Sequence, residues 1–310
     1  MTKWQSPMLE LPGAVPADGV DAGVAAHYGD PFREQRHLLD GDGYVDLSHR
    51  GVVRISGPDR LGWLHSLTTQ DLEGLEPGRT VTTLVLSPQG RVEHAMTGQD
   101  DSEAFWAHVE PGEAASLAEW LDSMRFMMRV EVADVSDEWA CVARDQETVE
   151  LVRRDKLADA VAGVPCGVWA YEALRIARGA ARFGADTDHR SIPNELGWLG
   201  SAVHLDKGCY RGQETVARVH TTGRPPRRLV LLHLDGSVDR LPASKDPVVL
   251  GEREVGYVGS AARHFELGPI ALAVVKRNTS ADAELLAGGV AAAQETVVDP
   301  EVGIHFRAQL

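Results

Sequence analysis

The order of apolar and polar residues predicts mixed α and β structure from Tyr44 onward. Two segments, 57–72 and 111–124, repeat apolar residues at helical spacing. Apolar runs of strand length precede, separate or follow them, at 44–47, 51–56, 79–87, 91–98 and 103–110. The turn at 87–90, Ser-Pro-Gln-Gly, predicts that 79–87 and 91–98 form a hairpin.

The next segment alternates apolar and polar residues. Phe126, Met128, Val130 and Val132 stand at every second position, which predicts a half-buried strand over 125–136. We expect the methionines and tryptophans here to lie in the core. Strands are then predicted at 138–145 and 147–154, a short helix at 155–162 and a longer one at 167–179, closed by Gly179. The repeated order of strand, helix and hairpin predicts two ferredoxin-like units, split near residue 135.

The two ends of the chain differ from the middle in composition and in predicted structure. Residues 1–35 are rich in Pro, Gly, Ala and Asp, which predicts a poorly ordered arm with a short helix within 23–35. After the hinge-like "GRPPRR", short apolar runs broken by Gly and Pro predict a small β-barrel or sandwich. The expected divisions are an arm at 1–37, an α+β region at 38–225 and a β-barrel domain at 226–310.

Charge and cysteine content narrow the functional classes. The formal net charge of the 310 residues is -15, which disfavours binding of nucleic acid or anionic membrane by the whole surface. One segment differs, because residues 207–228 hold six basic residues and one acid. That island predicts an anion site, although a solvated surface strand fits the charges equally well. Three unclustered cysteines fit a reducing cytoplasm, and no apolar run is long enough for a membrane helix.

The segment 207–214, "KGCYRGQE", is the most informative stretch. Its two glycines permit tight turns, so its backbone can approach a ligand closely. Lys207 and Arg211 are cations that favour the thiolate form of Cys209. Taken alone, the segment also fits a glycine turn around a buried, unreactive cysteine. No His or Asp stands at a spacing that identifies a hydrolase triad, and three scattered cysteines cannot supply a four-cysteine cluster site, so we expect no metal site.

Three further segments carry candidate chemistry. Ser48, His49 and Arg50 precede a predicted strand, and Glu93 and His94 follow the hairpin turn. The long polar loop 184–200 ends in a tryptophan able to stack on a flat heterocycle, although core packing is the commoner fate of a tryptophan. No dinucleotide fingerprint, P-loop or zinc-protease motif occurs in the sequence.

Taken in order, these segments resemble a known family. "DLSHRGVVRISGPDRLGWLHSLTTQDL", "LRIARGAARFGADTD", "PNELGWLG", "KGCYRGQETVAR" and "EVGYVGSAARHFELGPIALAVVKR" are similar to the glycine-cleavage T protein family, and within it to the folate-binding YgfZ branch. The resemblance spans about 38–300. Its most specific part is K-G-C-Y-x-G-Q-E at 207–214.

The resemblance implies a fold, a ligand and a role. The family fold is α+β: a three-domain cloverleaf in which two ferredoxin-like domains and a C-terminal β-barrel surround a central folate-binding opening. The ligand would be tetrahydrofolate or a derivative. The YgfZ branch supports assembly or repair of iron–sulfur enzymes, including tRNA-modifying ones. The implied partners are therefore iron–sulfur proteins or their assembly factors, with no direct nucleic acid or membrane contact.

The resemblance also implies site residues. Cys209 matches the motif cysteine and is expected to be a functional thiol, and Glu93 is a weaker catalytic candidate. The expected folate-binding residues are Ser48, His49, Arg50, Trp198, Lys207, Tyr210, Arg211, Gln213, Glu214 and Arg218.

Two departures separate this chain from the aminomethyltransferases of the family. They carry a catalytic Asp after a Gly-Gly turn, where this chain has Glu93 and His94. They also carry a pterin-binding Glu where this chain has Ala177. Both departures disfavour glycine-cleavage chemistry. A folate-dependent aminomethyl or other one-carbon transferase therefore remains the alternative, and a scaffold that docks a partner through the basic segment is a third.

Overall fold

The structure, a computed structural model, describes residues 4–301 and divides into two compact units. Unit 1 comprises residues 4–66, 71–83 and 94–174, and unit 2 comprises 67–70, 84–93 and 175–301. Each unit is described by itself. None of the helices over these residues is both long enough and apolar enough to cross a membrane.

The N-terminal segment is folded, which corrects the expectation of a poorly ordered arm. It contains a two-stranded sheet, helix α1 and two 3-10 turns: η1 (Pro7–Glu10), β1 (Val15–Pro16), η2 (Gly19–Asp21), β2 (Ala25–His27) and α1 (Pro31–Asp40). The sequence prescribes α1 locally, because Asp30 accepts hydrogen bonds from the N–H groups of Phe32 and Arg33, and the helix ends at Gly41 with a left-handed φ of 78°. The prediction from composition was wrong because this segment contributes buried residues, Val24, Ala25 and Ala26, to the core.

The first larger sheet of unit 1 has four strands, in the order β10-β9-β3-β11. They are Val149–Arg153, Trp139–Ala143, Gly43–Asp46 and Val164–Cys166. Only β3 and β11 run parallel. Helix α1 contacts that parallel pair, and the short segments η3 (Arg154–Lys156) and α4 (Leu157–Ala160) follow β10.

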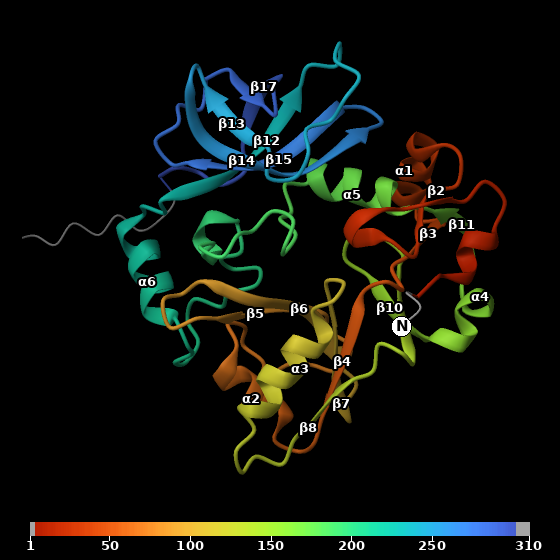
Figure 1. The fold of residues 1–310 in the computed structure, drawn as a ribbon. Coiled ribbons are helices and arrows are strands. Elements are labelled where there is room, and N and C mark those ends of the chain that lie inside the picture. The colour runs from red at the N-terminus through yellow and green to blue at the C-terminus, as the bar shows by residue number, and fades with distance from the viewer. Residues whose placement is uncertain (1–3, 302–310) are drawn as a thin grey trace, which may run out of the picture. The chain divides into compact units, whose positions relative to one another are not determined.

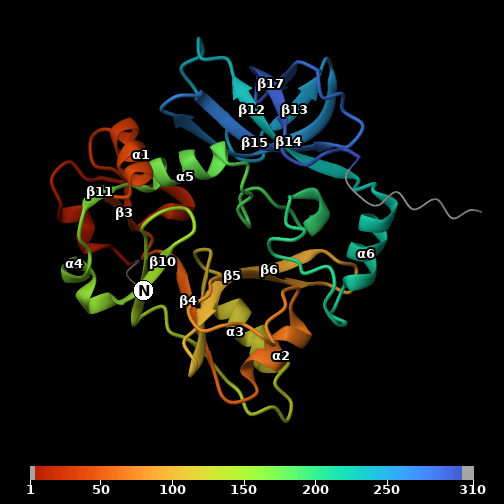
Figure 2. The same cartoon turned by 180° about the vertical axis from the view of Figure 1, so that it is seen from behind.

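The second larger sheet has five strands, in the order β5-β6-β7-β4-β8. Their bounds are Val81–Leu86, Val92–Asp100, Ala104–Val109, Gly51–Ser56 and Glu131–Asp134. Helices α2 (Arg60–Leu67) and α3 (Ala114–Ser123) lie side by side on it in both views (Figures 1 and 2). The indole N–H of Trp63 on α2 donates to the Met124 carbonyl that follows α3, which fixes the two helices together.

The segment between α3 and β8 corrects a second expectation. Phe126 and Met127 are 85% and 97% exposed, and Met128 is exposed too. Residues 125–129 form an exposed turn in which Phe126 has a φ of 46°, so β8 begins only at Glu131. Alternation predicted a strand here, but no neighbouring strand pairs with this part of the chain.

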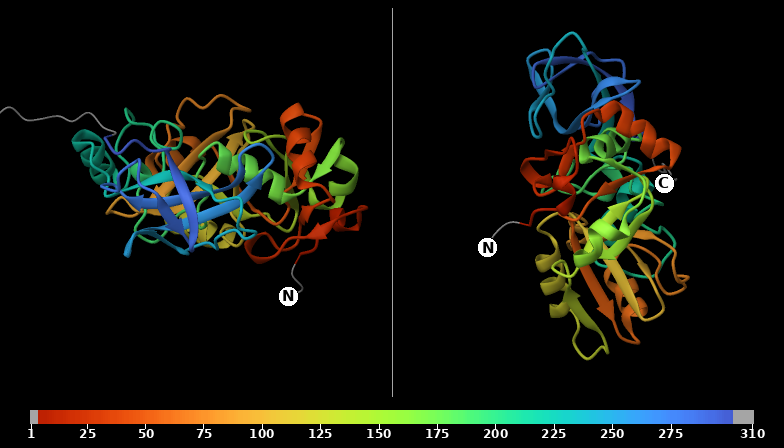
Figure 3. Two further views of the ribbon diagram at one scale, coloured as in Figure 1. Left: turned by 90° about the horizontal axis from the view of Figure 1, so that it is seen from above. Right: turned by 90° about the vertical axis from the view of Figure 1, so that its right-hand side faces the viewer.

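Unit 2 ends in a closed barrel of six antiparallel strands, in the order β12-β15-β14-β13-β16-β17. The strands are Arg227–Leu234, Gly268–Lys276, Arg253–His264, Pro247–Leu250, Leu285–Ala287 and Val290–Thr296. The right-hand view of Figure 3 shows them as a blue ring. Alternate residues fill the interior, such as Val230, Leu232 and Leu234 of β12.

One hairpin of the barrel escaped the sequence analysis. Strands β16 and β17 are joined by Gly288 and Gly289, both with positive φ, and their apolar residues are mostly alanines. The sequence predicts a strand in "ETVVDP" at 295–300, but only its first two residues lie in β17.

The remaining elements of unit 2 include the end of α5 (Val168–Ala177), η4 (Pro193–Glu195) and α6 (Gln213–Thr222). Gly179 has the left-handed φ of 69° expected of a helix terminator. The chain is thus an α+β protein with ferredoxin-like sheets and a closed β-barrel, as expected.

Candidate functional site

The segment 207–214 leads directly into α6. Gly212 has a φ of 81° and lies against the β5–β6 hairpin turn, where a side chain would meet Ser87. A Cβ at Gly212 would lie 2.4 Å from the Ser87 carbonyl oxygen and 3.0 Å from the Gly90 Cα. A Cβ at Gly90 would in turn lie 2.8 Å from the Thr215 Cβ of α6. Gly212 therefore permits a close approach to the protein's own hairpin turn, whereas the predicted approach of this backbone to a ligand stays a prediction.

Cys209 is exposed, whereas the other two cysteines are buried. Burial raises the pKa of both the Cys141 and the Cys166 thiols to about 12, which keeps them protonated at neutral pH. Since the thiolate is the reactive form of cysteine, accessible thiol chemistry in this chain belongs to Cys209. A buried, filler role for Cys209 is excluded by its exposure.

Both cations that flank the cysteine contact other groups. The buried ammonium of Lys207 donates to the carbonyls of Thr68 at 2.7 Å and Gln70 at 2.9 Å, and it lies 5.3 Å from the centre of the Tyr210 ring. Arg211 Nη1 donates to Glu93 Oε2 at 2.8 Å. The structure thus brings the two catalytic candidates, Cys209 and Glu93, into one neighbourhood through Arg211.

The other predicted residues of unit 2 divide into buried, half-buried and exposed groups. Gln213 braces the turn by donating to the carbonyls of Lys207 and Gly208 at 3.4 and 3.5 Å. Burial raises the pKa of the Tyr210 hydroxyl to about 12. Trp198 is half-buried in the loop after η4, while Glu214 and Arg218 are exposed on α6. Their side chains are accessible, and their folate contacts remain predictions.

Several cations of the basic island are engaged by groups of the protein itself, so the segment as a whole is not a cationic surface. Arg227 binds Asp188 at 2.6 Å and Glu195 at 2.8 Å. Arg228 is 0% exposed and donates to the Thr279 carbonyl and to Gln294. Two arginines of the island, at positions 218 and 224, are exposed. Net charge along the sequence could not reveal these partners.

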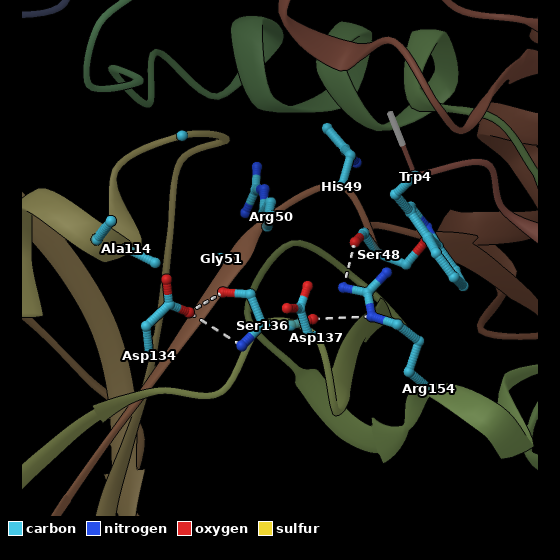
Figure 4. A pocket seen from close by; sticks show the side chains of 12 residues that line it. Trp4, Ser48, His49, Arg50, Gly51, Ala114, Asp134, Ser136, Asp137 and Arg154 are labelled. Carbon is cyan, nitrogen blue, oxygen red and sulfur yellow. Dashed lines mark hydrogen bonds between the residues drawn. The ribbon is translucent and has the colours of Figure 1, made fainter. Parts of the chain in front are cut away.

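Unit 1 places Ser48, His49 and Arg50 together in the turn between β3 and β4. A pocket of about 510 Å³ surrounds them, bounded by Trp4, the start of α3, the loop 134–137 and Arg154 (Figure 4). His49 Nε2 lies 2.9 Å from Asp21 Oδ1. The Arg50 side chain is buried and reaches Glu110 at 3.6 Å and the ring of Tyr171 at 5.6 Å.

Sequence analysis missed Trp4, Asp134, Asp137 and Arg154 as neighbours of this turn. They come from three separate segments, and no local pattern marks them. His94, the other histidine considered, lies 3.5 Å from Glu113 and beside Trp120. Over residues 4–301, no three His, Cys, Asp or Glu side chains are grouped to hold a metal ion.

Comparison with known proteins agrees with this architecture. Residues 26–143 match the family model described as the GCVT N-terminal domain. That match lies in the N-terminal half of the chain. The structure of glycine cleavage system aminomethyltransferase T from Bartonella henselae aligns with a TM-score of 0.77 at 15% identity, covering 95% of this chain and 96% of that one. That likeness concerns the fold.

Sequence relatives carry two kinds of name. An aminomethyltransferase of Streptomyces avermitilis is 31% identical, over 74% of this chain and 53% of its own length. The mitochondrial iron–sulfur cluster assembly factor IBA57 homolog of Mycosarcoma maydis is 26% identical, over 60% of this chain and 56% of its own. A putative chloroplastic transferase of Arabidopsis thaliana is 25% identical, over 73% and 64%. The chain thus spans between about half and two thirds of the length of these relatives.

Proposed function

We propose that this GCVT-domain protein binds tetrahydrofolate and assists the assembly or repair of iron–sulfur enzymes, including tRNA-modifying ones, with Cys209 as its functional thiol. The observation that carries the proposal is the exposure of Cys209, while Cys141 and Cys166 are buried and protonated. The likeness to an iron–sulfur cluster assembly factor supports the same role.

The surroundings of Cys209 suit a thiol that must meet a partner. The segment is held on both sides, by Lys207 on the carbonyls of residues 68 and 70 and by Arg211 on Glu93, while the thiol stays exposed. A fixed backbone with an accessible sulfur lowers the entropic cost of engaging another protein. The partners we propose are iron–sulfur proteins or their assembly factors.

A genetic test separates the thiol from its surroundings. A strain without its own copy of the gene would be complemented with the wild type, Cys209→Ala, or the control Thr221→Ala on the exposed side of α6. We expect Cys209→Ala to fail in restoring iron–sulfur enzyme activity, and the control to succeed. Full restoration by Cys209→Ala would remove the thiol from the proposal.

Folate binding has a direct test. Titration with 5-formyltetrahydrofolate should quench tryptophan fluorescence in a saturable manner, with the half-buried Trp198 as one reporter. The variant Trp198→Phe should retain binding with a smaller quench. Titration without saturation in both proteins would reject the folate part.

A second candidate is a folate-dependent aminomethyltransferase or other one-carbon transferase. The names of the Streptomyces relative and of the Bartonella structure favour it, and Glu93 would take the place of the catalytic carboxylate. Against it, Glu93 is engaged by Arg211, and Ala177 stands where the resemblance expects a pterin-binding Glu. Formation of methylene-tetrahydrofolate from an aminomethylated lipoyl carrier protein would establish this activity.

The docking scaffold is the weakest of the three functions. It uses the basic segment 207–228, in which Arg227 is held by two carboxylates and Arg228 is fully buried. Charge reversal at these positions would therefore disturb the barrel rather than report on a partner.

A further inference from the structure

The β-barrel of unit 2 encloses an arginine, Arg228, that pairs with no carboxylate of residues 4–301. We propose that Arg228 binds a small monovalent anion of the size of chloride inside one end of the barrel, where the anion stabilises the fold. The site involves neither Cys209 nor folate, so the proposal goes beyond the proposed function and is tested independently of it.

The alternation of β12 places Arg228 in the barrel interior. Val230, Leu232 and Leu234 follow it at every second position and belong to the barrel core, so the Arg228 side chain begins the same inward-facing row. Arg228 is 0% exposed. An arginine is almost never fully buried unless it is paired, because moving a charge out of water is costly.

The connection between β15 and β16 lies against the guanidinium. Arg228 Nη2 donates to the Thr279 carbonyl at 3.1 Å and to Gln294 Oε1 at 2.8 Å. The amide nitrogen of Gln294 donates to the carbonyls of Ser280 at 2.8 Å and Ala283 at 3.1 Å, which fixes the orientation of the amide. The two acceptors that Arg228 meets are therefore neutral oxygens in fixed positions.

Three polar atoms at this place are buried and have no hydrogen-bond partner among residues 4–301: Arg228 Nε, Arg228 Nη1 and Thr279 Oγ1. Thr279 is 6% exposed, and its own carbonyl is the one that Arg228 Nη2 binds, so its hydroxyl belongs to the same enclosed region. All three atoms can donate a hydrogen bond, and the two nitrogens can only donate. Unused donors around a positive charge are complementary to an anion.

No other group offsets the charge of Arg228 at close range. Burial lowers the pKa of its guanidinium, and Asp299, which opposes that shift, is exposed and forms no ion pair with it. An arginine stays protonated in proteins even so, and the barrel interior therefore keeps a positive charge. The neighbouring Arg227 provides the contrast, because it points to the other face of β12 and meets two carboxylates.

The enclosure of the guanidinium indicates the class of ligand. Because Nε and Nη1 are buried, the ligand must be small enough to be enclosed when the barrel closes. A monoatomic ion such as chloride accepts hydrogen bonds from any direction, whereas a carboxylate or a phosphate brings further oxygen atoms that need donors. A water molecule is similar in size, but it would satisfy the donors without offsetting the charge.

The first test compares thermal denaturation in chloride and in gluconate at the same ionic strength, because gluconate is too large to be enclosed. We expect the melting temperature of the wild type to be about 3 °C higher in chloride, since a ligand of the native state alone raises it. Arg228→Met keeps the length of the side chain, removes its charge and should abolish this difference. The matched control is Arg253→Met, which removes the same charge from an exposed position on β14 and should keep the difference.

Two further measurements keep the test decisive if Arg228→Met misfolds. Thr279→Val retains the shape of the side chain, removes the unpaired hydroxyl and should reduce the chloride effect. Crystals soaked in bromide should give an anomalous scattering peak beside the Arg228 guanidinium, because bromide replaces chloride.

Three results would overturn the anion site and assign a buried water to Arg228 instead. They are equal wild-type melting temperatures in the two salts, an undiminished chloride effect in either folded variant, and a bromide-soaked crystal without the peak. None of these results bears on folate binding or on the role of Cys209, so the proposed function stands or falls separately.

Discussion

Arg211 and Glu93 form an ion pair across 118 residues of sequence, with 2.8 Å between Nη1 and Oε2. The pair joins the segment that carries Cys209 to strand β6. Both side chains are about one-third exposed, at 34% and 37%. The pair therefore mainly positions the Cys209 segment, because an ion pair this exposed contributes little to the free energy of unfolding.

The first prediction concerns this pair. Glu93→Gln should lower the free energy of unfolding by no more than about 1 kcal/mol, because solvent screens a partly exposed pair. Urea denaturation followed by circular dichroism measures the change. A loss of several kcal/mol would show that the pair supports the fold of unit 2 and does not merely place the Cys209 segment.

Gly212 offers a sharper structural prediction. Gly212→Ala should destabilise the protein by about 2 kcal/mol or more, because φ is 81° and the new Cβ would lie 2.4 Å from the Ser87 carbonyl oxygen. Gly184→Ala is the matched control, since its φ is also 81° but nothing lies within 4 Å of a Cβ there. Equal losses in the two variants would contradict the close approach of α6 to the hairpin turn.

The ion pairs of Arg227 with Asp188 and Glu195 predict a loss of stability on mutation and a pH dependence of the free energy of unfolding. Arg227→Gln should lower the free energy of unfolding by about 3–5 kcal/mol, because it leaves two partly or fully buried carboxylates without their cation. Burial alone would raise the pKa of Asp188, but hydrogen bonds from Arg227 and the Arg190 N–H outweigh it and hold that pKa below its usual value.

The sign of the pH effect follows from this lowered pKa. The stabilisation should be fully present above about pH 4 and should fall as the pH drops further, because the unfolded chain takes up the proton first. In Arg227→Gln, the free energy of unfolding should decrease less steeply below pH 4. Denaturation curves between pH 2 and 7 measure both slopes, and parallel slopes would contradict the assignment.

Thiol labelling tests the burial of the cysteines. Iodoacetamide at neutral pH should modify Cys209 alone in the native protein, because Cys141 and Cys166 are buried with pKa values of about 12. All three should react in urea. Peptide mass mapping locates the label, and native labelling at Cys141 or Cys166 would disprove their burial.

The exposed turn after α3 gives the last prediction. Met127→Ser should change the free energy of unfolding by less than about 0.5 kcal/mol, whereas Leu121→Ala, at a fully buried site, should cost about 2–5 kcal/mol. Thermal denaturation of the two variants provides the comparison. A large loss for Met127→Ser would restore the strand that alternation predicted.

Hydrophobic periodicity by itself determined most element types. Strands β4 to β7 and helices α2, α3 and α5 fall where their patterns predicted, because the period of apolar residues reflects local geometry. The short apolar runs after "GRPPRR" form the predicted barrel. Gly179 and Gly212 were assigned for the same local reason, since their positions require left-handed backbone. The resemblance carried by the ordered motifs fixed the fold class.

Only the tertiary structure decided which charged and thiol side chains are accessible to a ligand or a partner. Arg211, Arg227 and Arg228 look alike as charges in the sequence, but partners 118, 32 and 51 residues away engage them. The same holds for the pocket, whose Trp4, His49 and Arg154 come from distant segments of unit 1. Burial and ion pairing depend on contacts across the chain, so a local pattern can place a cysteine in a glycine turn, but only the folded protein shows that its thiol faces outward.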